Sequence, residues 1–325
     1  MTQTTNQNAF IQFIISQRPS LMGVSIIAIL LYHSYVWITP EESKYLIVFK
    51  YGYIGVDIFM YLSGFGLCFS YAKNKLSTFY YRRLIRIFPL NILSGVLISL
   101  FVLQHGDCIT VWDIVCNIST LYYYGIGGTY WNWFIPAIII LYLAFPFLFF
   151  LSKKFDLYFF VILNIAIISI LVLYHIDWRY SCLISRLPVF VSGILTYFYI
   201  KNEKKIIELF LINFLLFIIC CSYNLSEYYL TTSFCPLLIV TIYLLKNRKP
   251  SIPFIETLGK YTLEIFLGNS ISYYVLHVFI RFHNGLFAEL FIYSISTCLI
   301  SYIFICINRF VSSRTYLHSN QNDHN

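Results

Sequence analysis

The chain has 325 residues, of which 59% are hydrophobic, 20% are aromatic and only 11% are charged. About a quarter of the residues of a soluble domain are charged, so one soluble core could not bury this much apolar surface, and lipid is the expected solvent. The formal net charge of +8 comes from short basic clusters between apolar spans. This pattern indicates membrane topology and not nucleic-acid binding.

Apolar runs close to the length that crosses a bilayer recur from one end of the chain to the other. They predict an all-α fold, a polytopic transmembrane bundle of about ten helices. The predicted spans lie near residues 21–38, 53–72, 87–103, 131–151, 157–174, 182–200, 206–222, 231–245, 258–280 and 286–307. We therefore divide the chain into a polar cytoplasmic segment (1–20), a single membrane domain (21–307) and a polar cytoplasmic tail (308–325).

Lysine and arginine are concentrated in alternate connections, namely those that follow the second, fourth, sixth, eighth and tenth predicted spans. The positive-inside rule places such connections in the cytoplasm, so both termini are predicted to be cytoplasmic. Residues 1–20 contain no basic segment that leads into a short apolar run and a cleavage site. A signal peptide is therefore not predicted, and the first helix is expected to remain in the mature protein.

The longest predicted outward connection, residues 104–130, is rich in glycine and tyrosine near its end. Two interpretations remain open: the connection lies at the lipid headgroups, or it covers the mouth of a pocket. It contains Cys108 and Cys116, which are either two free thiols or a disulfide formed in an oxidising compartment. The nine cysteines of the chain form no Cys-x-x-Cys pair, and no metal site is predicted.

Two ionisable side chains lie in the first two predicted spans. An ionisable group within a span costs roughly 2.5 to 3.5 kcal/mol on insertion scales, so each one marks a candidate site. His33 lies about two thirds of the way along the first span, and Asp57 lies about one turn into the second. Antiparallel neighbours joined by a short loop would place the two at similar depth, where Asp57 could orient His33 as a general base. The alternative is a histidine bonded to a backbone carbonyl and an aspartate that caps a helix.

Three arginines precede the third predicted span at its cytoplasmic end. Helical spacing brings Arg82 and Arg86 onto one face, with Arg83 beside them. Planar guanidinium groups bind phosphate oxygens in bidentate fashion. Arginines in this position also anchor helices to anionic headgroups, so phosphate binding and lipid anchoring are both open.

Further polar and aromatic candidates lie in later spans. Arg186 enters the sixth predicted span from the outer side, and Glu264 enters the ninth from the cytoplasm, where it either serves the site or pairs with Lys260 along one helix face. Trp133 begins the fourth span, where tryptophan also belongs on general grounds to an aromatic belt. Together with Tyr32, next to His33, Trp133 and Glu264 are candidate pocket residues.

Several ordered blocks of the sequence resemble the acyltransferase-3 family of bacterial membrane acyltransferases along nearly the whole chain. Leu21-Met22-Gly23 leads to a histidine, His33, at the family's spacing. Residues 55–65 are similar to the family's second-helix motif. The other similar blocks, in family order, are residues 79–89, with the Arg-x-x-Arg element at Arg83 and Arg86, and residues 133–136, 186–193 and 258–265.

Two departures from the family pattern bear on function. Met22 stands where family members have an arginine, and Arg18, one helical turn earlier, could replace that arginine only if its side chain reaches inward. The fourth span also lacks the Ser-x-Glu element of a branch that modifies surface polysaccharide. Its Trp-Phe-Ile-Pro form resembles the branch of sugar O-acetyltransferases that lack an attached soluble domain.

The resemblance implies a multi-pass O-acyltransferase of the bacterial inner (cytoplasmic) membrane. It implies transfer of an acyl group, most simply acetyl, from acyl-CoA to a sugar hydroxyl of a cell-surface glycan or its lipid-linked precursor, without a metal or tightly bound cofactor. In this hypothesis Arg82, Arg83 and Arg86 bind the CoA phosphates, His33 is the base oriented by Asp57, and Arg186 stabilises the oxyanion. Membrane lipids are the other expected partners, and nucleic acid is not.

Two alternatives come from other functional classes. A glycan exporter or lipid-linked sugar translocase could use the same buried charges to line a polar path, and Met22 gives that interpretation its best support. A catalytically inactive scaffold for glycan assembly is the third interpretation.

Overall fold

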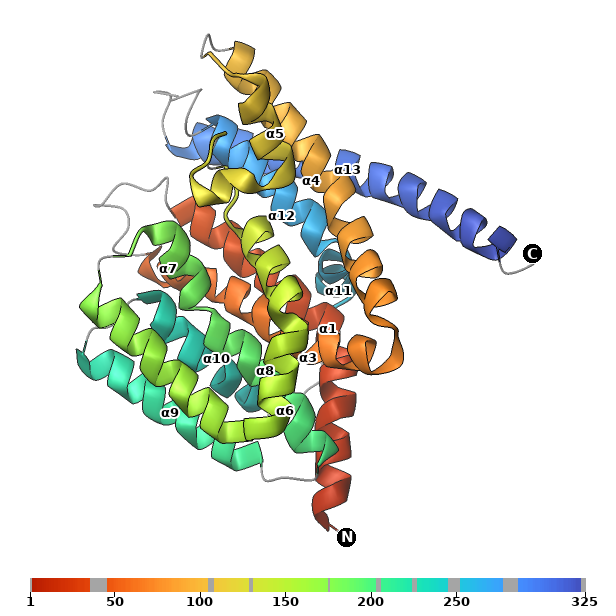
Figure 1. The fold of residues 1–325 in the computed structure, drawn as a ribbon. Coiled ribbons are helices and arrows are strands. Elements are labelled where there is room, and N and C mark those ends of the chain that lie inside the picture. Colours follow the sequence, from red (N-terminus) through yellow and green to blue (C-terminus); the bar gives the residue numbers. More distant parts are fainter. Residues whose placement is uncertain are drawn as a thin grey trace. The chain divides into compact units, whose positions relative to one another are not determined.

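The structure is a computed structural model that describes residues 2–35, 46–104, 108–128, 131–174, 176–202, 206–223, 227–244, 252–276 and 286–322. All regular structure in these ranges is helical, as predicted. In chain order the elements are α1 (Thr2–Tyr35), η1 (Ile47–Tyr53), α3 (Ile54–Lys73), α4 (Leu76–Gln104), α5 (Val111–Ser119), η2 (Leu121–Tyr124), α6 (Phe134–Leu173), α7 (Trp178–Ile184), α8 (Leu187–Lys201), α9 (Ile206–Tyr223), α10 (Glu227–Leu244), α11 (Pro253–Lys260), α12 (Thr262–Tyr274) and α13 (Leu286–Asn322) (Figure 1).

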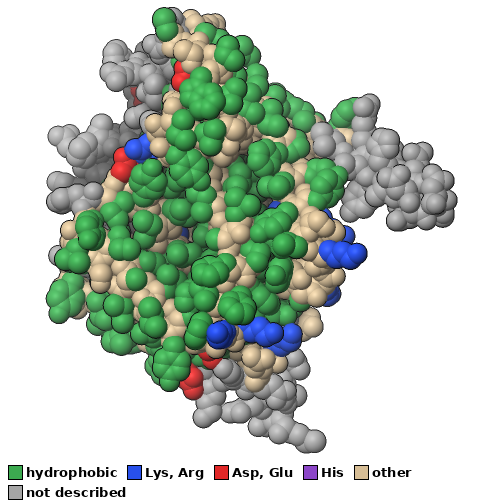
Figure 2. All heavy atoms as spheres, in the orientation of Figure 1, with side chains coloured by type: hydrophobic (Ala, Val, Ile, Leu, Met, Phe, Trp, Pro, Cys, Tyr) green, Lys and Arg blue, Asp and Glu red, His purple; other side chains and the backbone are tan. Residues whose placement is uncertain are grey.

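Seven of the described helices are long and apolar enough to cross a membrane, judged by length and composition. Hydrophobic side chains dominate the surface that Figure 2 shows, with few charged side chains among them. Helix α6 covers two of the predicted spans, and the shorter helices α10 and α12 lie at two more. The prediction of a polytopic helix bundle is therefore confirmed.

Several helix boundaries differ from the predicted ones. The predicted spans 131–151 and 157–174 form one element, α6, which is interrupted only at Asp156, where φ is 51° and ψ is −128°. At this point the chain reverses direction (Figure 1). Helix α4 begins at Leu76, well before residue 87, so the three arginines lie inside it. Helix α1 begins at Thr2, so the segment predicted as a polar terminus is helical, with a candidate span from Gln12.

The chain divides into two compact units: residues 1–36, 41–82 and 137–260 form the first, and residues 37–40, 83–136 and 261–325 form the second. In the first unit, α3 packs along α8 at two glycines. A Cβ atom at Gly64 would lie 2.1 Å from the carbonyl oxygen of Phe190, and one at Gly193 would lie 2.2 Å from that of Tyr61. Only glycine lets the two backbones approach so closely. The hydroxyl groups of Tyr61 and Thr196 are hydrogen-bonded at 2.9 Å across the same interface.

The second unit contains the connection whose placement the sequence left open. Its helix α5 starts with a capping box in which Thr110 accepts from the N–H of Asp113. The Asp113 carboxylate also accepts from the N–H of Gly128 at 2.9 Å, and Tyr122 donates to the carbonyl of Asn132 at 2.5 Å. The described part of the connection is thus a folded element. Its two cysteines, 108 and 116, are free thiols, exposed and buried respectively.

Candidate active site

The polar centre of the first unit is an ion pair between two side chains that are almost fully buried. Arg186 Nε lies 3.4 Å from Asp57 Oδ1, and the side chains are 1% and 0% exposed. Thr232 of α10 donates its hydroxyl to the same Asp57 oxygen at 3.1 Å. Arg186 Nη1 also donates to the carbonyl of Cys182 at 3.1 Å. Elements α3, α7, α8 and α10 therefore meet at one buried cluster, Asp57–Arg186–Thr232.

Two prolines explain how the local sequence presents this cluster. Pro188 lies in the first turn of α8, where a missing N–H costs nothing, and Arg186 stands at the N-cap position without a side-chain capping hydrogen bond. Pro236 lies inside α10. Because proline has no N–H, it cannot close the helical hydrogen bond to the carbonyl of Thr232, four residues earlier. Both partners of Asp57, Arg186 and Thr232, therefore lie close to a proline in their own helices.

The register of α1 against η1 and α3 is fixed by close backbone contacts at two further glycines, Gly52 of η1 and Gly55 of α3. A Cβ atom at Gly55 would lie 2.2 Å from the carbonyl oxygen of Ser25, and one at Gly52 would lie 2.2 Å from that of Ala28. Residue numbers rise along one element as they fall along the other, so the two elements run antiparallel. This register allows the depths of the predicted base and its predicted partner to be compared.

The expectation that His33 and Asp57 lie at similar depth is wrong. His33 lies eight residues beyond Ser25 along α1, whereas Asp57 lies two residues beyond Gly55 in the opposite direction. At about 1.5 Å per residue, the two backbone positions are offset by roughly 15 Å along the helix pair. The reason is that η1 extends the second element outward to the level of His33. Asp57 contacts Arg186 and Thr232, and the role of His33 as a base stays a prediction.

Among the described residues, His33 has aromatic neighbours. Its ring lies 5.5 Å from that of Tyr32, and Tyr32 meets Tyr53 edge-on at 5.4 Å between ring centroids. His33 and Tyr32 are half-buried, whereas Tyr53 is buried. The predicted base therefore lies in a partly covered position near the end of α1.

Arg18 does reach toward α3, but at a different level from Asp57. A Cβ atom at Gly66 would lie 3.5 Å from Arg18 Nη1. Gly66 is nine residues further along α3 than Asp57, or about 13 Å. The arginine that lies at Asp57 is therefore Arg186, and Arg18 does not supply a guanidinium there in place of Met22.

The three candidate donor-binding arginines lie within one continuous helix, α4, which runs from Leu76 to Gln104. Arg82 and Arg86 are exposed and share a helix face, as predicted from their spacing, while Arg83 is half-buried. Two of the three guanidinium groups are thus accessible for an anionic ligand.

The remaining candidates lie in the second unit, apart from Lys260. The helix is interrupted at Tyr261, so Lys260 ends α11 and Glu264 lies in the first turn of α12. Glu264 is buried and accepts a hydrogen bond from Asn308 of α13 at 2.5 Å. Trp133 is half-buried, with its ring 6.1 Å from that of Phe134.

The family model described as an acyltransferase domain matches residues 21–306, which is most of the chain. The chain belongs to the acyltransferase-3 family. No curated protein and no solved structure matches it.

For a member of the acyltransferase-3 family, the positions of the family blocks in the fold are informative. The second-helix block supplies Asp57 on α3, and the block that starts at Arg186 supplies α8. The two blocks are more than a hundred residues apart in sequence, yet they meet in the ion pair. Membership also establishes the general activity of this membrane protein, O-acyl transfer.

Sequence reasoning missed several polar residues of this acyltransferase. Thr232 binds Asp57, and Tyr229, one turn earlier on α10, donates to Asn164 of α6. All three are buried. The available signal was a polar residue four positions before a proline in an apolar helix, here Thr232 and Pro236. The proline leaves the carbonyl of that earlier residue without its helical hydrogen bond.

Proposed function

We propose that this acyltransferase moves an acetyl group from acetyl-CoA to a sugar hydroxyl of a cell-surface glycan or its lipid-linked precursor, in the bacterial inner membrane. The observation that carries the proposal is the family match over residues 21–306, joined to a buried ion pair that two family blocks create. A charged pair within a bundle of apolar helices is costly, which supports a functional role.

The donor is proposed to bind at the three arginines of α4. Acetyl-CoA carries phosphate groups, and exposed guanidinium groups on one helix face suit their oxygen atoms. Arg82 and Arg86 provide that face, and Arg83 lies beside them. Because α4 continues into an apolar span, phosphates bound there would leave the pantetheine arm free to extend along the helix into the membrane.

The chemical step is proposed to use His33 as the base. The acceptor hydroxyl gives its proton to His33 as its oxygen attacks the thioester carbonyl carbon, and the carbon–sulfur bond then breaks. CoA leaves as a thiolate and takes the proton, and the acetyl ester remains on the sugar. Asp57, which pairs with Arg186 and accepts a hydrogen bond from Thr232, is offset by roughly 15 Å from His33 along the helix pair, so the buried pair is proposed to position α3 and α8 and not to contact the oxyanion that forms beside His33. Tyr32, Trp133 and Glu264 remain candidate pocket residues.

Donor binding is tested by replacing Arg83 and Arg86 with glutamine in the purified protein. Loss of charge-assisted hydrogen bonds should weaken acetyl-CoA binding at least about tenfold. Lysine at the same positions should restore binding only in part, because an ammonium group cannot reproduce the bidentate contact. The matched control replaces Lys153 and Lys154 of α6, which removes the same charge elsewhere. Unchanged binding in the double glutamine variant would make the arginines lipid anchors.

The base is tested by the substitution His33→Ala, with radiolabelled acetyl-CoA and whole membranes as the source of acceptor. Transfer of label should fall by about 10² to 10⁴-fold while acetyl-CoA binding is retained. Retained transfer would rule out His33 as the base. If the unaltered protein neither binds acetyl-CoA nor transfers label, the transport function becomes the better explanation.

A further inference from the structure

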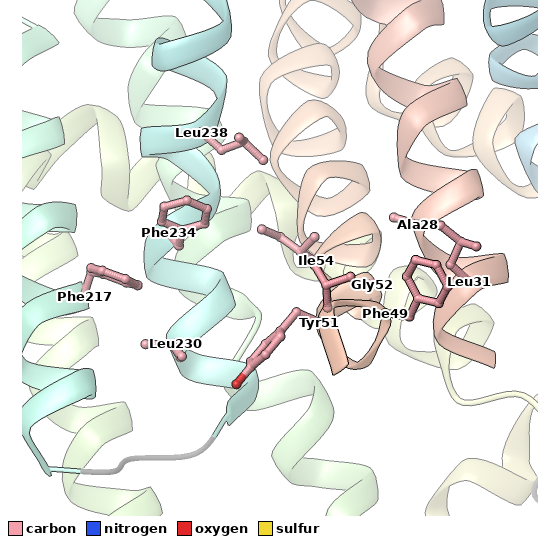
Figure 3. Close-up of a pocket in the computed structure, with 11 residues that line it drawn as sticks. Ala28, Leu31, Phe49, Tyr51, Gly52, Ile54, Phe217, Leu230, Phe234 and Leu238 are labelled. Atoms are coloured by element: carbon pink, nitrogen blue, oxygen red, sulfur yellow. The ribbon is translucent and has the colours of Figure 1, made fainter. Parts of the chain in front are cut away.

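An apolar pocket of about 510 Å³ lies in the first unit between α1, η1 and the start of α3 on one side and α9 and α10 on the other (Figure 3). Its size is within the range of ordinary ligand sites. Among the described residues that line it, Tyr51 has the only polar side-chain atom. The lining residues are Ala28, Leu31, Val48, Phe49, Tyr51, Gly52, Ile54, Phe217, Leu230, Phe234 and Leu238.

The pocket is open to its surroundings at residues that belong to apolar spans. Val48 is 68% exposed, Tyr51 is 43% exposed and Phe234 is 37% exposed. Because η1 and α3 form one candidate span, from Ile47 to Lys73, the medium outside the opening is expected to be lipid and not water. An apolar opening toward lipid suits a hydrocarbon chain.

The pocket and the buried cluster share helix α10. Leu230, Phe234 and Leu238 follow one another at intervals of four residues and form one face, which lines the pocket. Thr232, on a different face of the same helix, binds Asp57. On α3, Ile54 lines the pocket one turn before Asp57. A chain in the pocket would therefore lie within one or two helical turns of the cluster.

One described lysine lies next to the pocket residues in sequence. Lys50 is the only charged residue of η1 and lies between the lining residues Phe49 and Tyr51. A lysine that neighbours the lining residues in sequence suits a ligand with a long hydrocarbon part and an anionic end, because its ammonium group is a compact partner for phosphate.

We infer that this pocket binds the hydrocarbon tail of a lipid-linked sugar, with the linking phosphate near Lys50. The inference rests on the proposed function and narrows it: the acceptor is a membrane-bound sugar phosphate lipid and not a finished polymer. The donor arginines, which bind CoA in the proposal, lie on α4, whereas the pocket is formed by α1, η1, α3, α9 and α10. Because the donor phosphates are assigned to α4, the acceptor is the proposed occupant of the pocket.

The test uses the full-length protein in vesicles of phosphatidylethanolamine and phosphatidylglycerol. The probe is a polyprenyl phosphate that carries a photoreactive diazirine near the end of its chain, and cross-linked peptides are identified by mass spectrometry. Label should appear in residues 47–54 and 227–244. Excess unlabelled polyprenyl phosphate should displace it, and additional phosphatidylglycerol should not.

Two substitutions that narrow the pocket, Ala28→Phe and Leu238→Trp, should each reduce labelling at least about tenfold, the effect of losing roughly two methylene contacts. The matched control is Leu211→Trp on α9, because Leu211 is 58% exposed and does not line the pocket. Lys50→Gln should weaken labelling by the phosphate probe but not by a polyprenyl alcohol. Gel filtration and melting temperature verify that each variant is folded.

The inference is overturned if label does not enter the two segments, if Leu211→Trp lowers labelling as much as Leu238→Trp, or if phosphatidylglycerol competes equally well. The last result would mean that the pocket holds ordinary phospholipid chains. Transfer of radiolabel from acetyl-CoA is measured in the same vesicles with a short-chain sugar acceptor. Transfer without labelling would reject lipid binding in the pocket and leave the proposed acetyl transfer standing. Labelling without transfer would support lipid binding in the pocket and reject the proposed acetyl transfer.

Discussion

Two ion pairs of this protein have opposite surroundings. Arg179 Nη2 and Asp177 Oδ2 lie 2.6 Å apart at the start of α7, with the side chains 18% and 39% exposed. Arg186 and Asp57 lie 3.4 Å apart but are almost fully buried. Water and salt screen the shorter pair, and exposed pairs contribute little. The longer pair cannot exchange its partners for water, so breaking it leaves a buried charge. Burial, more than distance, sets the consequence.

The largest expected effect comes from breaking the buried pair. Asp57→Ala leaves Arg186 as a buried charge without its carboxylate, which should cost about 3 to 5 kcal/mol of the free energy of unfolding. The double variant Asp57→Leu with Arg186→Met removes both charges and should recover most of that loss. The measurement is denaturant unfolding in detergent. If the double variant is as unstable as the single one, the charge itself is not the cause.

A smaller effect is expected from the hydroxyl group that supports this pair. Thr232→Val keeps the shape of the side chain but removes its hydrogen bond to Asp57, so it should cost about 1.5 to 3 kcal/mol, the range for hydrogen bonds to charged groups. The matched control is Thr241→Val on the same helix, where the hydroxyl is exposed and donates to the carbonyl of Leu237. Equal unfolding midpoints for the two variants would contradict this role.

The smallest effect is expected at the exposed pair. Hydrogen bonds from the side chain and backbone N–H of Arg179 lower the pKa of Asp177 from 3.8 to about 2. Because the pKa of Asp177 is lower in the folded state than in the unfolded state, the ionised carboxylate stabilises the folded protein above about pH 4. This stabilisation is lost as the pH falls toward 2. Because the pair is exposed and screened, this stabilisation is small, so Asp177→Asn should lower the melting temperature only slightly at neutral pH, and the difference should disappear as the pH falls toward 2. A clear loss of stability at neutral pH would contradict the comparison.

Much of the fold could be predicted because hydrophobic length alone decides which segments enter the membrane. Breaks inside long helices could not. The reversal at Asp156 depends on one residue's backbone dihedral angles, and the start of α4 at Leu76 precedes its apolar run. Hydropathy does not report either feature.

The candidate site could be predicted as a set of residues but not as a set of contacts. Asp57 and Arg186 were each identified as ionisable groups in apolar spans, yet their pairing depends on how α3 packs against α8. Their opposite charge was the available signal, since buried charges usually pair. The proposed partnership of His33 with Asp57 failed because it assumed a short connection, where the chain instead builds η1.

The glycine contact between α3 and α8 also limits how these helices can change during evolution. Any side chain at Gly64 would clash with the backbone carbonyl of Phe190, and any side chain at Gly193 with that of Tyr61. A backbone atom cannot be made smaller by mutation, so a replacement at one glycine has no compensating replacement at the other. The two positions should therefore stay glycine independently of each other, without the paired changes that side-chain contacts allow.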